Sequence, residues 1–185
     1  MALQAAEAIV AARGLAGLSA RKIASGMGYT VGSLYLVFRN LDDLILHMNG
    51  RTLDALYQAL RQRADGAQGE DGVLALAHAY VDFAGRHQGL WDAVFQFRRP
   101  QGEALPGGYQ AKVRRMFALV EERLAPVVPD KSPTELVVAA RALWSGVHGV
   151  CTLSLTGSFS AAGVQSVREL VDSLVRNYLR GLSTA

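Results

Sequence analysis

The segment from Leu18 to Arg39 constrains the fold most, because it has the pattern of two short helices joined by a glycine turn. Ser19 can cap the first helix, since its hydroxyl can accept a hydrogen bond from an unpaired N–H of the opening turn. Gly26 and Gly28 mark the break, because glycine enters left-handed backbone without a Cβ clash. Thr30 can then cap the second helix. The pattern predicts a helix-turn-helix.

The second helix of this motif has an apolar side and a polar side. Leu34 and Phe38 lie one turn apart and are predicted to face the core. Thr30, Ser33 and Tyr35 lie on the outer side or near the helix start. The DNA major groove is about 12 Å wide and admits one helix, and small side chains let a helix lie deep in it. We predict that the second helix reads bases while the first crosses the DNA backbone.

Residues 19–44 also carry a set of residue types at fixed spacing. The set is Ser19, Ile23-Ala24, Gly28-Tyr29-Thr30, Gly32, Leu34-Tyr35 and Phe38, followed by a charged loop from Arg39. At these positions the chain resembles the TetR family of bacterial transcriptional regulators. The resemblance is specific over residues 2–60 and architectural beyond. It implies an all-α protein with a three-helix helix-turn-helix DNA-binding domain at 1–45 and a helical-bundle ligand-binding and dimerisation domain at 46–185.

The resemblance implies a ligand-responsive regulator, most often a repressor, that binds a palindromic operator as a homodimer. Charge supports a contact with double-stranded DNA. Residues 1–39 hold four basic residues and one acidic residue, whereas the rest of the chain holds equal numbers of each. Phosphate attraction requires such an excess on the reading unit. The predicted phosphate contacts are Ser19, Arg21, Lys22 and Arg39, and the predicted base contacts are Thr30, Ser33, Tyr35 and Leu36.

Leu36 has two interpretations of equal weight. It can touch a thymine methyl group in the major groove, or it can pack against a neighbour in the protein. The resemblance implies that many relatives carry polar residues where Leu36 and Val31 stand, and it implies a basic arm before the first helix, which we do not expect in this sequence. These departures are the basis for one alternative function, a ligand-binding helical protein that has lost sequence-specific DNA binding.

Apolar periodicity predicts further helices after the reading motif. The expected ranges are 41–63, 73–87, 89–98, 109–124, 134–157 and 164–182, after a first helix at 2–12. The helix at 134–157 is apolar nearly all round, which predicts burial on more than one side. Its apolar run contains Arg141 and His148, which favours a buried or interface helix over a membrane span.

The two C-terminal helices predict a two-fold four-helix dimer interface. The predicted dimer residues are Val147, Val167, Leu170, Val171, Leu174 and Tyr178. Helix-bundle interiors also host apolar ligand sites, and the predicted lining residues are Trp91, Phe95, Tyr109, Phe117, Trp144, His148 and Cys151. The alternative is that these side chains only fill the core. Trp144, His148 and Gly149 resemble a Trp-His-Gly signature of one TetR subgroup. Because no acidic cluster calls for a cation, we expect an apolar or weakly polar effector.

The sequence offers no catalytic pattern, and we expect neither an enzyme nor a metal or other cofactor. The histidines and the single cysteine, Cys151, lack metal-ligand spacing. No residue is paired with a base as a nucleophile would be. One cysteine excludes an internal disulfide and suits a reducing compartment. With no signal peptide pattern, we expect a cytoplasmic protein with no membrane partner.

Overall fold

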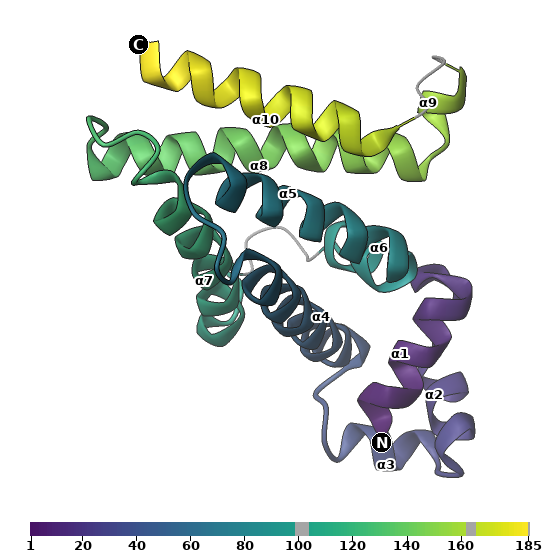
Figure 1. The fold of residues 1–185 in the computed structure, drawn as a ribbon. Helices are drawn as coiled ribbons and strands as arrows, with labels where there is room; N and C mark the ends of the chain where they lie inside the picture. Colours follow the sequence, from purple (N-terminus) through teal and green to yellow (C-terminus); the bar gives the residue numbers. More distant parts are fainter. Residues whose placement is uncertain (99–103, 162–165, 185) are drawn as a thin grey trace. The chain divides into compact units, whose positions relative to one another are not determined.

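The computed structural model describes residues 1–98, 104–161 and 166–184, and these residues form helices and no strand. The all-α prediction is confirmed (Figure 1). The elements are α1 (Ala2–Arg13), a 3₁₀ turn η1 (Leu15–Gly17), α2 (Ala20–Met27), α3 (Val31–Tyr35), α4 (Leu41–Ala64), α5 (Gly69–Arg86), α6 (Gln88–Gln96), α7 (Gly107–Leu124), α8 (Pro133–Leu155), α9 (Ser158–Ala161) and α10 (Val167–Thr184). The expected start of the last helix at residue 164 lies outside the described residues.

Contacts divide the chain into two compact units that alternate along the sequence. The first unit is Met1–Ala55 with His87–Lys112, and the second is Leu56–Arg86 with Val113–Ala185. Helices α4 and α7 therefore contribute to both units. The boundary expected at residue 45 stays a prediction. The sequence pattern did not indicate that α6 belongs with the N-terminal helices.

The first unit has one apolar core shared by α1, α2, α3, α4 and α6. Its buried members are Ala6, Val10, Ile23, Leu34, Phe38, Leu44, Ile45, Met48 and Ala93. Close-packed interiors of this kind fix the position of each helix. The helix-turn-helix motif therefore packs on a core to which α6, more than forty residues further along the chain, also contributes.

Helix α6 approaches both α1 and α4 closely within this unit. A Cβ atom at Gly89 would lie 2.5 Å from the carbonyl oxygen of Val10, so α1 and α6 meet backbone to backbone. The fully buried Asn49 of α4 donates from Nδ2 to the carbonyl oxygen of Ala93 at 3.1 Å. A buried amide is costly unless it is hydrogen-bonded, so this bond ties α6 to α4.

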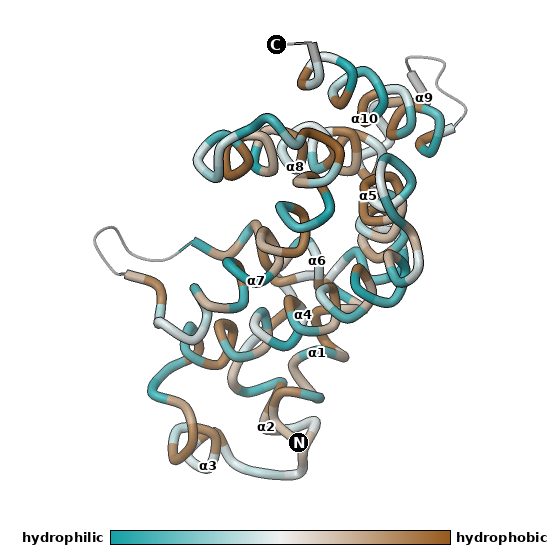
Figure 2. The backbone as a smooth tube through the Cα atoms, turned by 60° about the vertical axis from the view of Figure 1, so that its left-hand side comes forward, coloured by the Kyte–Doolittle hydropathy of each residue, from teal (hydrophilic) through white to brown (hydrophobic). Residues whose placement is uncertain are grey.

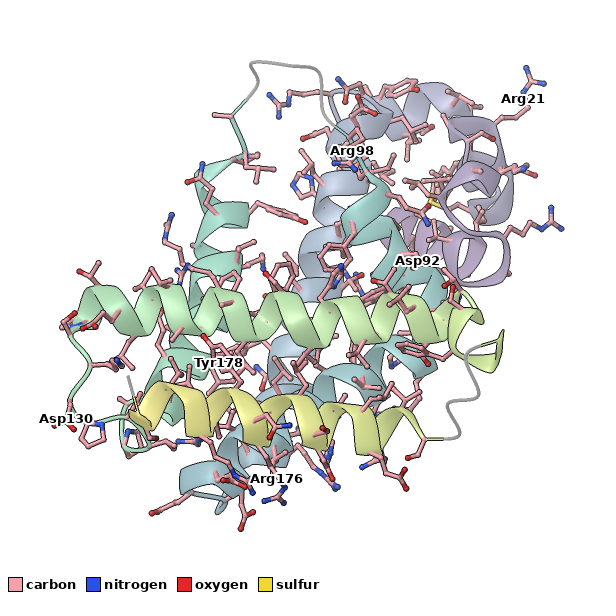
Figure 3. All side chains as sticks on the ribbon, turned by 90° about the horizontal axis from the view of Figure 1, so that it is seen from above. Arg21, Asp92, Arg98, Asp130, Arg176 and Tyr178 are labelled. Carbon is pink, nitrogen blue, oxygen red and sulfur yellow. The ribbon has the colours of Figure 1, made fainter. Side chains whose placement is uncertain are left out.

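Helices α5, α8 and α10 pack against one another in the second unit (Figure 1). Helices α8 and α10 run side by side, and a Cβ at Gly146 would lie 3.0 Å from Cδ2 of Leu174. The hydroxyl of Tyr178, between these helices in Figure 3, donates to the carbonyl oxygen of Ala139 at 3.0 Å. Ion pairs also join α5 to α10, between Asp82 and Arg168 and between Glu70 and Arg176. A hydrogen bond joins His78 on α5 to Asp172 on α10.

Helix α8 begins at a capping box and has two different faces. The Ser132 hydroxyl accepts from the Glu135 N–H at 3.3 Å, and the Glu135 carboxylate accepts from the Ser132 N–H at 2.8 Å. One face is buried among the chain's own helices. The other face leaves Val138 63% exposed and Leu153 46% exposed. The sequence predicted that this helix is buried on more than one side. Within a single chain, only one side of α8 is buried.

Among the residues that the structure describes, α8 is long and apolar enough to cross a membrane by length and composition. A single helix of that kind is weak support for a membrane span, since core helices pass the same test. The Arg141 guanidinium on α8 donates to the Glu121 carboxylate of α7 at 2.5 Å. This ion pair is a contact between two helices of the protein and favours a packed helix over a membrane span.

Candidate nucleic-acid interface

The helix-turn-helix forms where the sequence predicts it, and both caps are present. The Ser19 hydroxyl accepts from the Lys22 N–H at 3.3 Å, and the Thr30 hydroxyl accepts from the Ser33 N–H at 3.4 Å. Gly28 has φ 72°, the left-handed conformation that ends α2. Because Gly26 lies inside α2, the turn rests on Gly28, where any other residue would carry a backbone strain.

Core contacts decide which side of α3 is exposed. Leu34 and Phe38 are 2% and 7% exposed, as predicted, and they anchor the two ends of the turn after α3. Tyr35 and Leu36 are 46% and 88% exposed. The hydroxyls of Thr30 and Ser33 lie 3.1 Å apart and share a hydrogen bond. This short helix therefore presents two hydroxyls, a phenol and an isobutyl group to solvent.

Arg39 is held at the start of α4 by a carboxylate. Its backbone N–H donates to Oδ2 of Asp43 at 3.0 Å, and its guanidinium donates to Oδ1 at 3.1 Å. Both bonds lower the pKa of the Asp43 carboxyl below its usual value, and the bond from the Arg39 side chain has the larger effect. Asn40 caps the helix by accepting from the Asp43 N–H at 2.8 Å. The Arg39 side chain is still 78% exposed, so it can approach a phosphate with part of its charge already compensated.

The other predicted phosphate contacts lie on α2. Lys22 donates from Nζ to the carbonyl oxygen of Gly17 at 2.7 Å and stays exposed. The Arg21 side chain extends outward from α2 (Figure 3). Ser19 is half-buried and its hydroxyl caps the helix. All eight predicted DNA-contact residues therefore lie in one motif of one unit, in the way that a helix-turn-helix uses such groups.

A hollow of about 390 Å³ lies beside α3 in the first unit. It is lined by Met1, Ala2, Leu3, Met27, Tyr29, Ser33, Leu34, Val37, Phe38 and Arg51. Arg51 at its edge is paired with Glu7 at 2.8 Å. The hollow shares none of the residues predicted to line an effector pocket.

The second unit contains a chain of ring contacts. The Trp144 ring contacts the Phe117 ring edge-on, with 5.5 Å between ring centroids, and stacks on the His148 ring, with 5.0 Å between centroids. The His148 Nδ1 lies 2.8 Å from the Tyr80 hydroxyl. Burial lowers the pKa of His148, because desolvation disfavours the charged imidazolium. Cys151 is buried one turn further along α8. The cluster therefore combines aromatic surface with a hydrogen-bonded hydroxyl–imidazole pair.

The remaining residues predicted to line a pocket belong to the first unit. Trp91 is buried on α6 and contacts Phe95 at 4.9 Å. Tyr109 on α7 has its pKa raised by burial. The predicted set is thus divided between the two units. The predicted lining residues do not include Tyr80, because no local pattern links Tyr80 to a histidine 68 positions away.

The predicted dimer residues occupy different depths. Val147 and Val171 are 4% and 0% exposed, so both side chains belong to the core of a single subunit. Leu174 and Tyr178 contact α8 of the same chain. The other predicted residues, Val167 and Leu170, are half-buried. The exposed apolar residues of α8 that the prediction omitted are Val137, Val138 and Leu153.

These features define a helix-turn-helix protein with a second, all-helical unit. Comparison with known families gives two matches. Residues 2–48 match the bacterial regulatory proteins of the tetR family, and residues 73–178 match the tetracyclin repressor-like C-terminal domain. The chain belongs to the TetR family. The Trp-His-Gly subgroup stays a prediction.

One relative supports this assignment, and solved structures share the fold. An HTH-type transcriptional regulator of Mycobacterium tuberculosis is 31% identical over 140 residues, which span 76% of this chain and 62% of that protein. The chain thus covers less than two thirds of that relative's length. A solved Rhodococcus sp. RHA1 protein has a TM-score of 0.82 at 24% identity, covering 98% of this chain and 93% of that one. FadR from Bacillus subtilis, solved with stearoyl-CoA, has a TM-score of 0.75 at 14% identity, covering 97% of each chain. At these identities the two structures show the fold.

Proposed function

We propose that the protein is a ligand-responsive transcriptional regulator, acting as a repressor, that binds a palindromic operator as a homodimer in the cytoplasm. The observation that carries this proposal is the exposed side of α3. Its hydroxyls and Tyr35 face solvent, while Leu34 and Phe38 fix the segment from behind. Cations on α2 and at the start of α4 flank it.

Each subunit places α3 in a major groove. Thr30, Ser33 and Tyr35 contact base edges, and Arg21, Lys22 and Arg39 contact phosphates and set the register. Ser19 contributes through the N-terminal end of α2, which its hydroxyl caps. The two reading helices of a dimer meet half-sites separated by roughly 34–36 Å or a multiple of it.

The second copy covers the exposed apolar face of α8. Val138 and Leu153 are large apolar side chains on the outer side of the same helix. A two-fold axis lets one such face pack against its own copy. Helix α10 borders this surface through Val167 and Leu170, which are half-buried.

The effector binds beside the aromatic cluster of the second unit. Trp144 and Phe117 offer apolar surface, and the Tyr80–His148 pair offers a polar group at neutral charge. Such a mixture suits an apolar or weakly polar molecule. FadR from Bacillus subtilis, which shares this fold, was solved in complex with stearoyl-CoA. An effector shifts DNA binding only by its differential affinity for two states of the protein, and α4 runs from the reading unit into the second unit.

The alternative is a ligand-binding helical protein that has lost its DNA function. The observation in its favour is that α3 carries an apolar residue at Val31 and another just beyond its end at Leu36. Such a protein keeps the dimer and the aromatic cluster. It shows no preference among DNA sequences.

Selection from a random duplex pool separates the two functions. The purified protein is incubated with the pool at moderate salt, and bound DNA is amplified and sequenced. The proposal expects an inverted repeat, because a two-fold dimer presents two identical reading helices. Recovery of no common sequence, at moderate and at low salt, would contradict the proposal and favour the alternative.

A further inference from the structure

Two adjacent apolar side chains are largely exposed just beyond the end of α3. Leu36 is 88% exposed and Val37 is 74% exposed. We call Leu36 and Val37 the apolar step. Part of the backbone at α3 is coloured as hydrophobic in Figure 2. Single exposed apolar residues are ordinary on protein surfaces, but two neighbours on the reading element form a surface that contact with a partner would remove from water.

The apolar step is held in a fixed position. The N–H groups of Val37 and Phe38 both donate to the carbonyl oxygen of Leu34 at 3.1 Å. Leu34 and Phe38, on either side of the step, are buried in the core of the first unit. The step therefore cannot turn inward without breaking core contacts. This placement argues against the interpretation of Leu36 as a residue packed on a neighbour within the chain.

The charges near the step favour duplex DNA as its partner. Arg39 follows the step directly, and Arg21 and Lys22 stand exposed on the preceding helix. Between Leu18 and Arg39 these three cations face no acidic residue of the same segment. Arg39 is shared with Asp43, and Lys22 donates to a backbone carbonyl. These cations attract a polyanion such as DNA. Because two of them already bond within the protein, their attraction for DNA is weaker than that of three free cations would be.

Duplex DNA offers one prominent apolar group on the major-groove edges of its bases, the C5-methyl group of thymine. We propose that Leu36 and Val37 read thymine methyl groups in each half-site, so that the protein discriminates DNA by its methyl groups as well as by hydrogen bonds. This inference rests on the proposed function and adds Val37 as a specificity-determining residue. A 5-methylcytosine in place of thymine offers the step the same methyl group.

The test uses the full chain and the operator recovered by selection. Each thymine is replaced in turn by deoxyuridine, which keeps every hydrogen-bonding group and removes only the methyl. At one or two positions of each half-site we expect the dissociation constant to rise about 3- to 5-fold, the size expected for one buried methyl group. A second pair of operators carries cytosine or 5-methylcytosine at the same positions, and the methylated duplex should bind more tightly.

Two variants assign the effect to the step. Leu36→Ala and Val37→Ala should each lose the sensitivity to uracil at the position that the deleted side chain contacts. Leu105→Ala is the matched control, because Leu105 is also an exposed leucine but lies just before α7, outside both the helix-turn-helix and α8, and it should keep the wild-type sensitivity. Thermal unfolding should be unchanged in the Leu36 and Val37 variants, since both side chains are exposed.

Each outcome decides the inference. Uracil sensitivity in the wild type that disappears in either step variant supports it. Equal binding of thymine and uracil operators overturns it and leaves the proposed function intact. Sensitivity that survives in both variants overturns the assignment to Leu36 and Val37. Recovery of no inverted repeat in the selection overturns the proposed function and this inference together.

Discussion

At the scale of single residues, the polar side chains of α3 differ in what holds them. Thr30 accepts from the Ser33 N–H, and the two hydroxyls bond to each other. Replacing either one therefore changes the helix cap as well as the proposed DNA contact, and cap loss alone costs about 1 kcal/mol. Tyr35, also on α3, is 46% exposed. It is the side chain of α3 whose removal tests base reading most cleanly.

Tyr35→Ala is expected to weaken operator binding by about 1–3 kcal/mol, the range for a good base contact. Fluorescence anisotropy with a labelled operator measures the change. Tyr35→Phe keeps the ring, so comparison of the two variants separates the hydroxyl from the aromatic contact. Both variants should unfold at the wild-type temperature. Unchanged affinity of the alanine variant would contradict the role assigned to Tyr35.

His148 makes a prediction about pH. Burial lowers the pKa of His148 below the usual 6.5, so the unfolded chain takes up the proton more readily than the folded one. The stability from the neutral imidazole is complete above pH 6.5 and is lost as pH falls through the lower folded pKa. Unfolding between about pH 8 and about pH 5 should show this decline, and His148→Gln should reduce it. An NMR titration placing the pKa of His148 at or above 6.5 would contradict the prediction.

At the scale of helices, the position of the reading motif depends on α6. Gly89 lets the backbone of α6 approach α1 near Val10, and Asn49 ties α6 to α4. The motif itself spans residues 19–38, yet its core includes Ala93. A change in α6 should therefore alter the stability of the reading unit without touching α3.

Gly89→Ala is expected to destabilise the protein by about 1–3 kcal/mol, the usual cost of overpacking, because its Cβ would clash with backbone atoms of α1. Gly85→Ala is the matched control. Gly85 lies near the end of α5 with nothing within 4 Å of an added Cβ, so the change should stabilise by about 0.5–1 kcal/mol. Chemical denaturation measures both. A Gly89→Ala protein as stable as wild type would show that α1 and α6 do not meet so closely.

At the scale of the whole molecule, the proposed dimer depends on the exposed apolar face of α8. Leu174→Glu is a poor probe of the dimer, because Leu174 contacts Gly146 within the same chain. Val138 is 63% exposed and lies on the open side of α8. A charge at this position should affect a second copy and leave the subunit's own core unchanged.

Val138→Glu is expected to convert the dimer to a folded monomer, because two glutamates would meet near a two-fold axis in an apolar contact. Sedimentation velocity measures the mass, and circular dichroism checks the fold. Val138→Thr, nearly the same shape, is the control and should stay dimeric. A Val138→Glu protein that still sediments as a dimer would place the interface elsewhere.

The sequence by itself determined the local structure of the reading motif. The caps at Ser19 and Thr30, the turn at Gly28 and the buried pair Leu34 and Phe38 stand as the residue pattern predicts. Each depends on hydrogen bonds or on i, i+4 spacing between residues close together in the chain. The residues that make these contacts are close together in the sequence, so the pattern can be predicted without knowing which distant helices complete the core.

Only the tertiary structure decided which distant surfaces meet. It placed α6 with the N-terminal helices, joined Tyr80 to His148, and buried Val147 and Val171 inside the subunit. An apolar stripe shows that a helix face is to be covered, but every apolar face is compatible with many partners. The choice among them is a property of packing in three dimensions. For the same reason, only the packed structure shows that the apolar residues of α8 and of the apolar step stay exposed within a single chain.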